Sequence, residues 1–386
     1  MNPKLNCEYP EPDEARLIDE MVRVVVERMK PQQGFFRRGQ HAKATGCVRG
    51  VFTIRDDVAD ELRHGVFRQP NQSFQAIVRF SNSAETIDPD GRGAARGMAI
   101  KLLDVDGTQA IPGTDNRSQD FLVINHPVFP FATPAEYVKL FEIRAAPLVV
   151  GELLATTWLA LFRRRHLKIL KQFLGGIIIP ATPLVGDPMA GVWLAIFHPR
   201  HLKSVIEIIS KTVDSPLMRY WSGSPYWLGP SGTTGGRAVK YSLVPRFNGT
   251  PPPDAPSRKT DDYLGQTLQH YLRTQEVVFE FRVQPQTDPV AMPVEDTSVE
   301  WDEEVSKPIP VATLTIGVQD VDSAEGRALT EECEEMAFSP WNALAEHRPM
   351  GGINRLRQAV YLASQAKREA KPGCKTSSPA KSTNRT

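Results

Sequence analysis

The sequence predicts an α+β protein organised around an antiparallel β-barrel. Short β-rich runs fall into two groups, within residues 47–130 and 236–318, mostly without crossover helices between neighbouring runs. The interval between them, residues 134–235, is helical in pattern and predicts an insertion into the barrel. We therefore expect one domain over residues 1–370. Residues 371–386 predict a disordered tail, because they are mainly Lys, Ser, Thr and Pro without an apolar period.

The composition of the 386-residue chain is that of an ordinary globular protein, with 41% hydrophobic residues, 24% charged residues and a formal net charge of +1. This near-neutral balance argues against nucleic acid as the main partner. The cysteines lie far apart without a C-x-x-C pair, which predicts separate thiols in a reducing compartment; they are Cys7, Cys47, Cys333 and Cys374. Because the first ten residues contain no apolar signal segment, we predict a cytoplasmic protein.

The first predicted element is an amphipathic helix over residues 13–30. Its apolar side is formed by Leu17, Met21, Val24 and Val25. Residues 35–44 then predict an irregular, basic connection into the first strand.

Strands are predicted where β-branched and aromatic residues form alternating or continuous runs bounded by Gly, Pro, Asn or Asp. The first group is Cys47–Ile54, Ser73–Ser81, Gly97–Leu103 and Asp120–Ile124. The second group is Gly236–Arg246, Glu276–Pro285 and Val311–Val318. Seven or eight such strands favour a closed barrel or a sandwich.

The helical insertion contains an internal near-repeat. The segment that begins at Trp158 resembles the one that begins at Trp193, which predicts a duplicated helical hairpin. The apolar run 147–162 is too short to span a bilayer and is followed by basic residues. It is typical of a buried helix with a basic end, and a second interpretation is peripheral contact with a membrane surface through residues 147–205.

The last predicted helix covers residues 353–369 and presents a stripe of polar side chains. Arg357, Tyr361, Ser364 and Arg368 stand at i, i+4, i+7 and i+11, so they share one helix face. On its own such a stripe is typical of a solvated face. A phenol has an ordinary pKa of about 10, so a tyrosinate needs a neighbouring cation, and Arg357 stands one turn before Tyr361. Tyrosinate is one of the protein ligands that haem iron accepts.

Three segments of the first strand group carry groups that suit the opposite side of such a site. Residues 38–46 place His41 in a loop before the first strand. Arg79 and Ser81 end the second predicted strand, and Asn125 ends the fourth. A lone loop histidine is more often structural than catalytic, so this interpretation depends on the three segments together.

Five segments, in chain order, resemble motifs of the haem catalase superfamily, which includes catalase-related haem proteins of the allene oxide synthase type. Arg38–Ala44 resembles Arg-x-x-His-Ala-Lys-Gly, Val78–Asn82 resembles Val-Arg-Phe-Ser-Thr, Arg96–Lys101 resembles Arg-Gly-Phe-Ala-Val-Lys, Asn125–Phe129 resembles Asn-x-Pro-Val-Phe, and Arg357, Tyr361 and Arg368 match Arg-x-x-x-Tyr with a further Arg.

The resemblance implies a catalase-like antiparallel β-barrel with a helical insertion and a C-terminal haem-ligand helix, and haem b (iron protoporphyrin IX) as cofactor. It implies the following roles: Tyr361 as the iron ligand, Arg357 holding it as tyrosinate, His41 as distal acid–base, Ser81 orienting His41, Asn125 positioning the peroxide, and Arg38, Arg79 and Arg368 pairing with the haem propionates. These roles agree with elementary chemistry. A neutral imidazole with an ordinary pKa of about 6.5 can move a proton between peroxide oxygens, and arginine suits carboxylates.

The chain also departs from the catalase pattern. Gln40 stands where catalases carry valine, Ala44 replaces a glycine, and Ile124–Asn125 replaces two consecutive asparagines, which leaves the register of the distal asparagine open by one residue. The chain is also shorter than typical catalases, and its oligomeric state stays open.

Three functions fit this pattern. The first is a haem enzyme that decomposes hydrogen peroxide or organic hydroperoxides by dismutation or peroxidation. The second is a fatty-acid hydroperoxide isomerase or dehydrase of the allene oxide synthase type. The third is a non-catalytic haem-binding protein, against which the His41, Ser81 and Asn125 set argues, because haem storage needs no acid–base.

Overall fold

The structure is a computed structural model that describes residues 3–29, 31–32, 35–36, 38–84, 86–114, 117–145, 199–210, 213–232, 234–248, 251–252 and 260–369. The predicted repeat at Trp158 and Trp193, most of the proposed membrane-contact segment 147–205, and the predicted tail 371–386 lie outside these residues. Within them, no helix is both long and apolar enough to cross a membrane.

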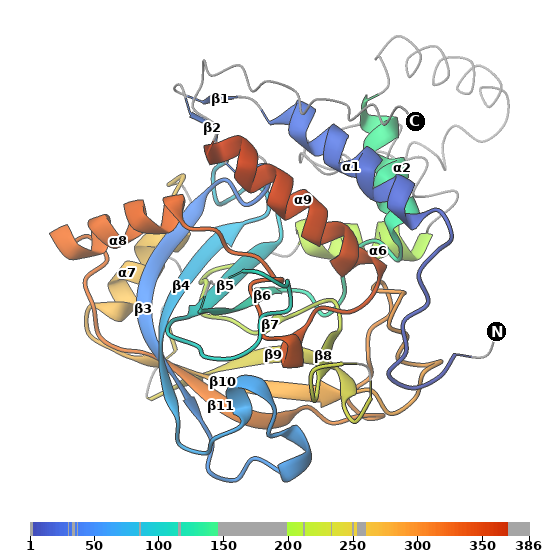
Figure 1. The fold of residues 1–386 in the computed structure, drawn as a ribbon. Coiled ribbons are helices and arrows are strands. Elements are labelled where there is room, and N and C mark those ends of the chain that lie inside the picture. The colour runs from blue at the N-terminus through green and yellow to red at the C-terminus, as the bar shows by residue number, and fades with distance from the viewer. Residues whose placement is uncertain are drawn as a thin grey trace, which may run out of the picture.

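The centre of the molecule is a closed antiparallel barrel of eight strands (Figure 1). In order around the barrel these are β10 (Val277–Pro285), β11 (Ile309–Ile316), β3 (Ala44–Ile54), β4 (Ser73–Asn82), β5 (Arg96–Leu102), β6 (Gln119–Ile124), β7 (Tyr220–Trp221) and β9 (Arg237–Phe247), which pairs again with β10. Strand β8 (Tyr226–Leu228) adds to β9, and β1 (Pro31–Gln32) forms a separate ladder with β2 (Phe35–Phe36). The seven predicted strands are therefore confirmed, and closure leaves the barrel without long free edges.

The barrel interior is filled by aromatic and aliphatic side chains. Alternate residues of each strand point inward, as in β10, where Val277, Phe279 and Phe281 are buried in succession. Phe281 packs at 5.2 Å from Phe52 and 4.8 Å from Phe121, measured between ring centroids. This interior is a packed core rather than a pore, as expected for a barrel of about eight strands.

Three helices form an apolar layer over one end of the barrel. They are α1 (Glu14–Arg28), α2 (Pro134–Ala145) and α9 (Gly352–Glu369), and α9 lies between α1 and the barrel (Figure 1). Leu17 and Met21 of α1 join Ile353 and Leu356 of α9 in one buried cluster. The predicted helices 13–30 and 353–369 are thus confirmed, and each buries the apolar face that its periodicity indicates.

An ion network fixes the start of α9. Arg355 donates to Glu8 and Glu14 at 2.6 Å each and to Glu295 at 2.9 Å, so one guanidinium ties α9 to α1 and to two surrounding loops. Such a partly buried network restricts the orientation of the helix and of the polar stripe that it carries.

The remaining elements correct two expectations. The range 134–235 is not helical throughout, because β7 and β8 lie inside it; helix α6 (Pro199–Ser210) also falls in this range. Helices α7 (Tyr263–Leu272) and α8 (Ala324–Glu335) have no counterpart among the predicted elements. Three short 3-10 turns complete the described elements, at Asp60–Leu62, Gly65–Phe67 and Ala345–His347.

Candidate active site

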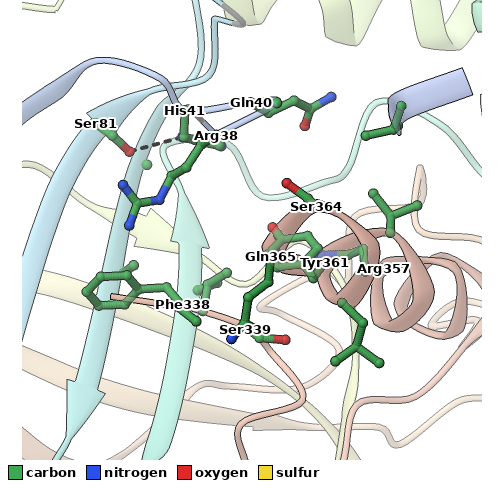
Figure 2. Close-up of a pocket in the computed structure, with 18 of the residues that line it drawn as sticks. Arg38, Gln40, His41, Ser81, Phe338, Ser339, Arg357, Tyr361, Ser364 and Gln365 are labelled. Atoms are coloured by element: carbon green, nitrogen blue, oxygen red, sulfur yellow. Dashed lines mark hydrogen bonds between the residues drawn. The ribbon is translucent and has the colours of Figure 1, made fainter. Parts of the chain in front are cut away.

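A cavity of about 360 Å³ lies between α9 and the end of the barrel. His41 and Ser81 reach it from the barrel side, and Tyr361 and Arg357 reach it from α9 (Figure 2). Cofactor and ligand pockets typically enclose about 300–1,000 Å³, so the cavity is of cofactor size. It therefore unites residues that lie more than three hundred positions apart in the chain.

His41 is held in an unusual backbone conformation. Its φ of 57° lies in the left-handed region, which non-glycine residues adopt rarely and which clusters at functional sites. Arg79 donates to the His41 carbonyl oxygen at 3.0 Å, and the His41 Nδ1 atom lies 3.0 Å from the Ser81 hydroxyl. Gly97 lies directly behind the ring, where a Cβ atom would come within 2.7 Å of Cε1. The ring is thus positioned by Ser81 on one atom, and the missing side chain of Gly97 leaves room for it.

The environment of His41 keeps its imidazole neutral. Burial lowers the pKa of His41 to about 3, and the charges of Arg79, Arg357 and Arg38 act in the same direction. Since Nδ1 is engaged by Ser81, Nε2 is the nitrogen left to exchange a proton with a molecule in the cavity.

On the α9 side, Arg357 organises the phenol of Tyr361. Its Nη2 atom donates to the Tyr361 hydroxyl at 3.4 Å, and its Nη1 atom donates to Asn354 Oδ1 at 3.0 Å and to the Ser224 hydroxyl at 3.4 Å. Burial by itself lowers the pKa of Arg357, but the phenols of Tyr361 and Tyr226 raise it above the ordinary arginine value. Arg357 is thus a permanent cation beside a phenol oxygen, the arrangement that a tyrosinate requires.

Arg38, Arg79 and Arg368 form a cationic cluster around the C-terminal end of α8. Arg38 donates to one carboxylate oxygen of Glu334 at 2.9 Å, and Arg79 donates to the other at 2.9 Å and 3.1 Å. Arg368 donates to the Glu334 backbone carbonyl at 3.3 Å. All three arginines line the cavity, and burial lowers the pKa of Arg38 to about 9. Two of these cations therefore share the Glu334 carboxylate, and the third binds the backbone of the same residue.

The structure does not bring the Asn125 side chain to the cavity. Asn125 is buried, its Oδ1 atom accepts from the Arg96 backbone N–H at 2.8 Å, and Ile124 lines the cavity wall in its place. Asn125 directly follows the last residue of β6, and its hydrogen bond to the β5 backbone holds its side chain apart from the cavity lining. The role predicted for Asn125 thus has no geometric support among the described residues.

Gln40 is also tied to the helical layer. Its side-chain nitrogen donates to the Tyr137 hydroxyl at 2.9 Å, which links the loop before His41 to α2. Apolar residues of α1 and α9, among them Met21, Val25 and Val360, continue the cavity wall on this side. The cavity therefore has a cationic edge near α8 and a largely apolar edge at α1, where Arg28 is the charged residue of α1 in the wall.

Comparison with solved structures identifies the architecture. A fungal catalase superposes with a TM-score of 0.61 at 16% identity and covers 96% of this chain and 65% of its own. A bacterial catalase gives a TM-score of 0.57 at 15% identity over 94% of this chain and 62% of its own. Catalase A from Saccharomyces cerevisiae gives 0.59 at 14% identity over 96% and 68%. The fold is that of the catalases.

The catalase-like fold is thus present at low sequence identity, and the chain spans about two thirds of the length of these catalases. No protein-family model matches the chain. No curated protein sequence matches it either.

The structure corrects the prediction that the cysteines are separate thiols. Cys47 of β3 and Cys333 of α8 form a disulfide across 286 positions, while Cys7 is free. No spacing rule predicts this pair, because nothing in the sequence places the α8 segment beside β3.

Two further residues of the site were not predicted as site residues. Glu334 lies on a helix that was not predicted. Asn354 is buried in the first turn of α9, and its side-chain oxygen accepts a hydrogen bond from Arg357. The signal available for Glu334 was the run Ser323 to Glu335, which has a helix-capping serine followed by good helix formers.

Proposed function

We propose that the protein is a haem-dependent enzyme that acts on peroxides. The observation that carries the proposal is the arrangement of two pairs across one cavity: His41 with Ser81 on the barrel side and Arg357 with Tyr361 on α9. The catalase-like fold supports the same conclusion.

The residues present fit haem in donor type and in charge. Tyr361 offers a phenol oxygen that is already hydrogen-bonded to a buried cation, which suits a tyrosinate ligand to iron. Arg38, Arg79 and Arg368 all line the cavity, so this arginine cluster is placed to pair with the two carboxylates of haem. Bidentate arginine is well suited to binding them.

Bound there, haem would supply an electrophilic, redox-active iron that weakens a peroxide O–O bond. The chain's own residues would manage the proton. The neutral His41 would accept it at Nε2 from one peroxide oxygen and return it to the departing oxygen. Ser81 would keep the imidazole in the tautomer and orientation for this transfer, while Arg357 would keep the Tyr361 phenol anionic.

The apolar wall favours a second candidate, an enzyme that decomposes or rearranges an organic hydroperoxide, such as that of a fatty acid. Ile124 and the α1 edge of the cavity offer aliphatic contact to an alkyl group, whereas hydrogen peroxide gains little from apolar side chains. The two candidates share His41 and Tyr361 and differ in the substrate and in the reaction that follows cleavage of its O–O bond.

The first test is an absorption spectrum of haem-supplemented protein before and after peroxide, with an oxygen electrode in the same cuvette. We expect a ferric haem spectrum of the tyrosinate type and consumption of peroxide. Oxygen release would assign dismutation of hydrogen peroxide, and consumption of alkyl or fatty-acid hydroperoxides without oxygen would assign the second candidate. Failure to bind haem would overturn the proposal.

A further inference from the structure

We propose that Cys47 and Cys333 form a redox-modifiable site that sets the position of the cavity arginines. With the disulfide formed, the C-terminal end of α8 is fastened to β3 and holds Arg38 and Arg79 in place. With the disulfide reduced, this hold is released. The inference rests on the proposed function where it concerns haem affinity.

The contacts of one short segment carry the coupling. Cys333 and Met336 accept hydrogen bonds from Arg38 through their carbonyl oxygens, at 2.8 Å and 2.6 Å. Glu334, between them, accepts from Arg38 and Arg79 through its carboxylate and from Arg368 through its carbonyl. All three arginines of the cluster thus depend on where residues 333–336 lie, and Cys333 is the covalent anchor of that segment.

Apart from these polar contacts, helix α8 buries few side chains against the barrel. Of its twelve residues only Leu329 and Cys333 are buried. These two pack in a small cluster with Cys47, Ile77 and Phe338, apart from the main core. An element with few buried apolar contacts opens at low free energy, so a covalent bond to β3 changes its population of open states strongly.

The same cluster connects the sulfur atoms to the cavity. Phe338 packs in that cluster, lines the cavity, and lies within 5.9 Å of the Arg38 guanidinium. Loss of the sulfur–sulfur bond therefore disturbs both the backbone that accepts from Arg38 and the ring beside it.

Two ordinary classes of reagent would interconvert the two thiols and the disulfide. A peroxide oxidises one thiol to a sulfenic acid and leaves as an alcohol or water; the second thiol then displaces water and forms the disulfide. A dithiol reverses the step by donating two electrons and two protons and becoming a disulfide itself. A protein that meets peroxide would thereby acquire its fully ordered cavity on exposure to its own class of substrate.

The test measures haem release from loaded protein to excess apomyoglobin, with and without dithiothreitol. We expect reduction to speed release from the wild type by about tenfold, equivalent to about 1.4 kcal/mol. Cys47→Ser should release haem at this faster rate without reductant and show no further change with it. Cys7→Ser is the matched control, because Cys7 is free in the described part of the chain, and it should keep both the slow rate and the response.

Amide hydrogen exchange of the same proteins without haem gives a second readout. We expect faster exchange over residues 324–336 and 38–43 on reduction or in Cys47→Ser. Unchanged exchange, or faster α8 exchange with unchanged haem release, would overturn the inference and leave the proposed function standing. Failure of the oxidised wild type to bind haem would overturn the proposed function, while exchange over residues 38–43 would still decide the coupling.

Discussion

Two buried histidines, one inside the barrel and one in the cavity, show what distinguishes a structural site from a reactive one. His347 accepts from the Val66 backbone N–H at Nε2, at 3.0 Å, and its Nδ1 atom lies 3.2 Å from the Tyr241 hydroxyl. Both of its ring nitrogens are therefore satisfied by the core. His41 has its Nδ1 atom engaged by Ser81 and turns the rest of its ring to the cavity.

The two rings have the same protonation but not the same task. Burial lowers the pKa of each to about 3, helped by neighbouring arginines at His41 and by His64 at His347. A depressed pKa is thus no indication of function here. Three features differ: the Nε2 atom of His41 has no hydrogen bond to the described residues, the backbone of His41 is left-handed, and Tyr361 lines the same cavity from α9 (Figure 2).

The largest expected effect is on haem binding, and it should distinguish Tyr361 in the cavity from Tyr241 inside the barrel. Tyr361→Phe removes the only atom by which this residue could bind iron, so haem retention should be lost. Changes to the partners of metal ligands alone typically cost about 10- to 100-fold in affinity, and loss of the ligand should exceed that. Tyr241→Phe, inside the barrel, should bind haem normally. Haem titration followed by absorption checks both; a normal spectrum in Tyr361→Phe would refute the ligand assignment.

Substituting the two histidines should give opposite phenotypes. His41→Ala should leave haem bound and slow the reaction with peroxide by about 10²–10⁴-fold, the usual effect of losing a positioned acid–base. His347→Ala should leave Val66 and Tyr241 unpaired beside a void and lower the free energy of unfolding by about 3 kcal/mol. Stopped-flow kinetics measures the reaction rate with peroxide, and urea unfolding measures the free energy of unfolding; both variants are measured by both methods. Equal loss of rate in both variants would contradict the comparison.

A methyl group behind His41 should affect the reaction by displacing the imidazole ring, without removing any polar group of the site. Gly97→Ala places a Cβ atom 2.7 Å from the ring and must displace it, and a shift near 1 Å can reduce a rate by about 10²-fold. Gly91→Ala is the matched control, because its Cβ would meet no atom within 4 Å. The reaction rates of the haem-loaded variants with peroxide test this prediction. A fully active Gly97→Ala variant would show that the reaction does not depend on the position of the His41 ring.

The smallest expected effect is on acid stability. Both histidines titrate near pH 3 when folded and near 6.5 when unfolded, so the unfolded chain binds more protons between these values and stability falls as pH falls. Each histidine contributes a slope of up to about 1.4 kcal/mol per pH unit. His347→Gln and His41→Gln should each reduce the slope of unfolding free energy between pH 6 and 4. The rate of the reaction with peroxide, measured as a function of pH, should show no inflection near pH 6.5.

The sequence by itself determined the elements and the motif residues of the site. Strand alternation predicted the seven main strands, and helical spacing put Arg357, Tyr361 and Arg368 on one face of the last helix. These features depend on periods of two and 3.6 residues, which are visible within a short window.

Only the tertiary structure decided which side chains reach the cavity and what holds them there. Ile124 lines the cavity and the neighbouring Asn125 does not, and sequence spacing does not resolve a difference of one residue. Glu334 and the Cys47–Cys333 disulfide join segments about 250 to 290 positions apart. Contacts of this kind depend on how the closed barrel and α8 pack, and no local period encodes that packing.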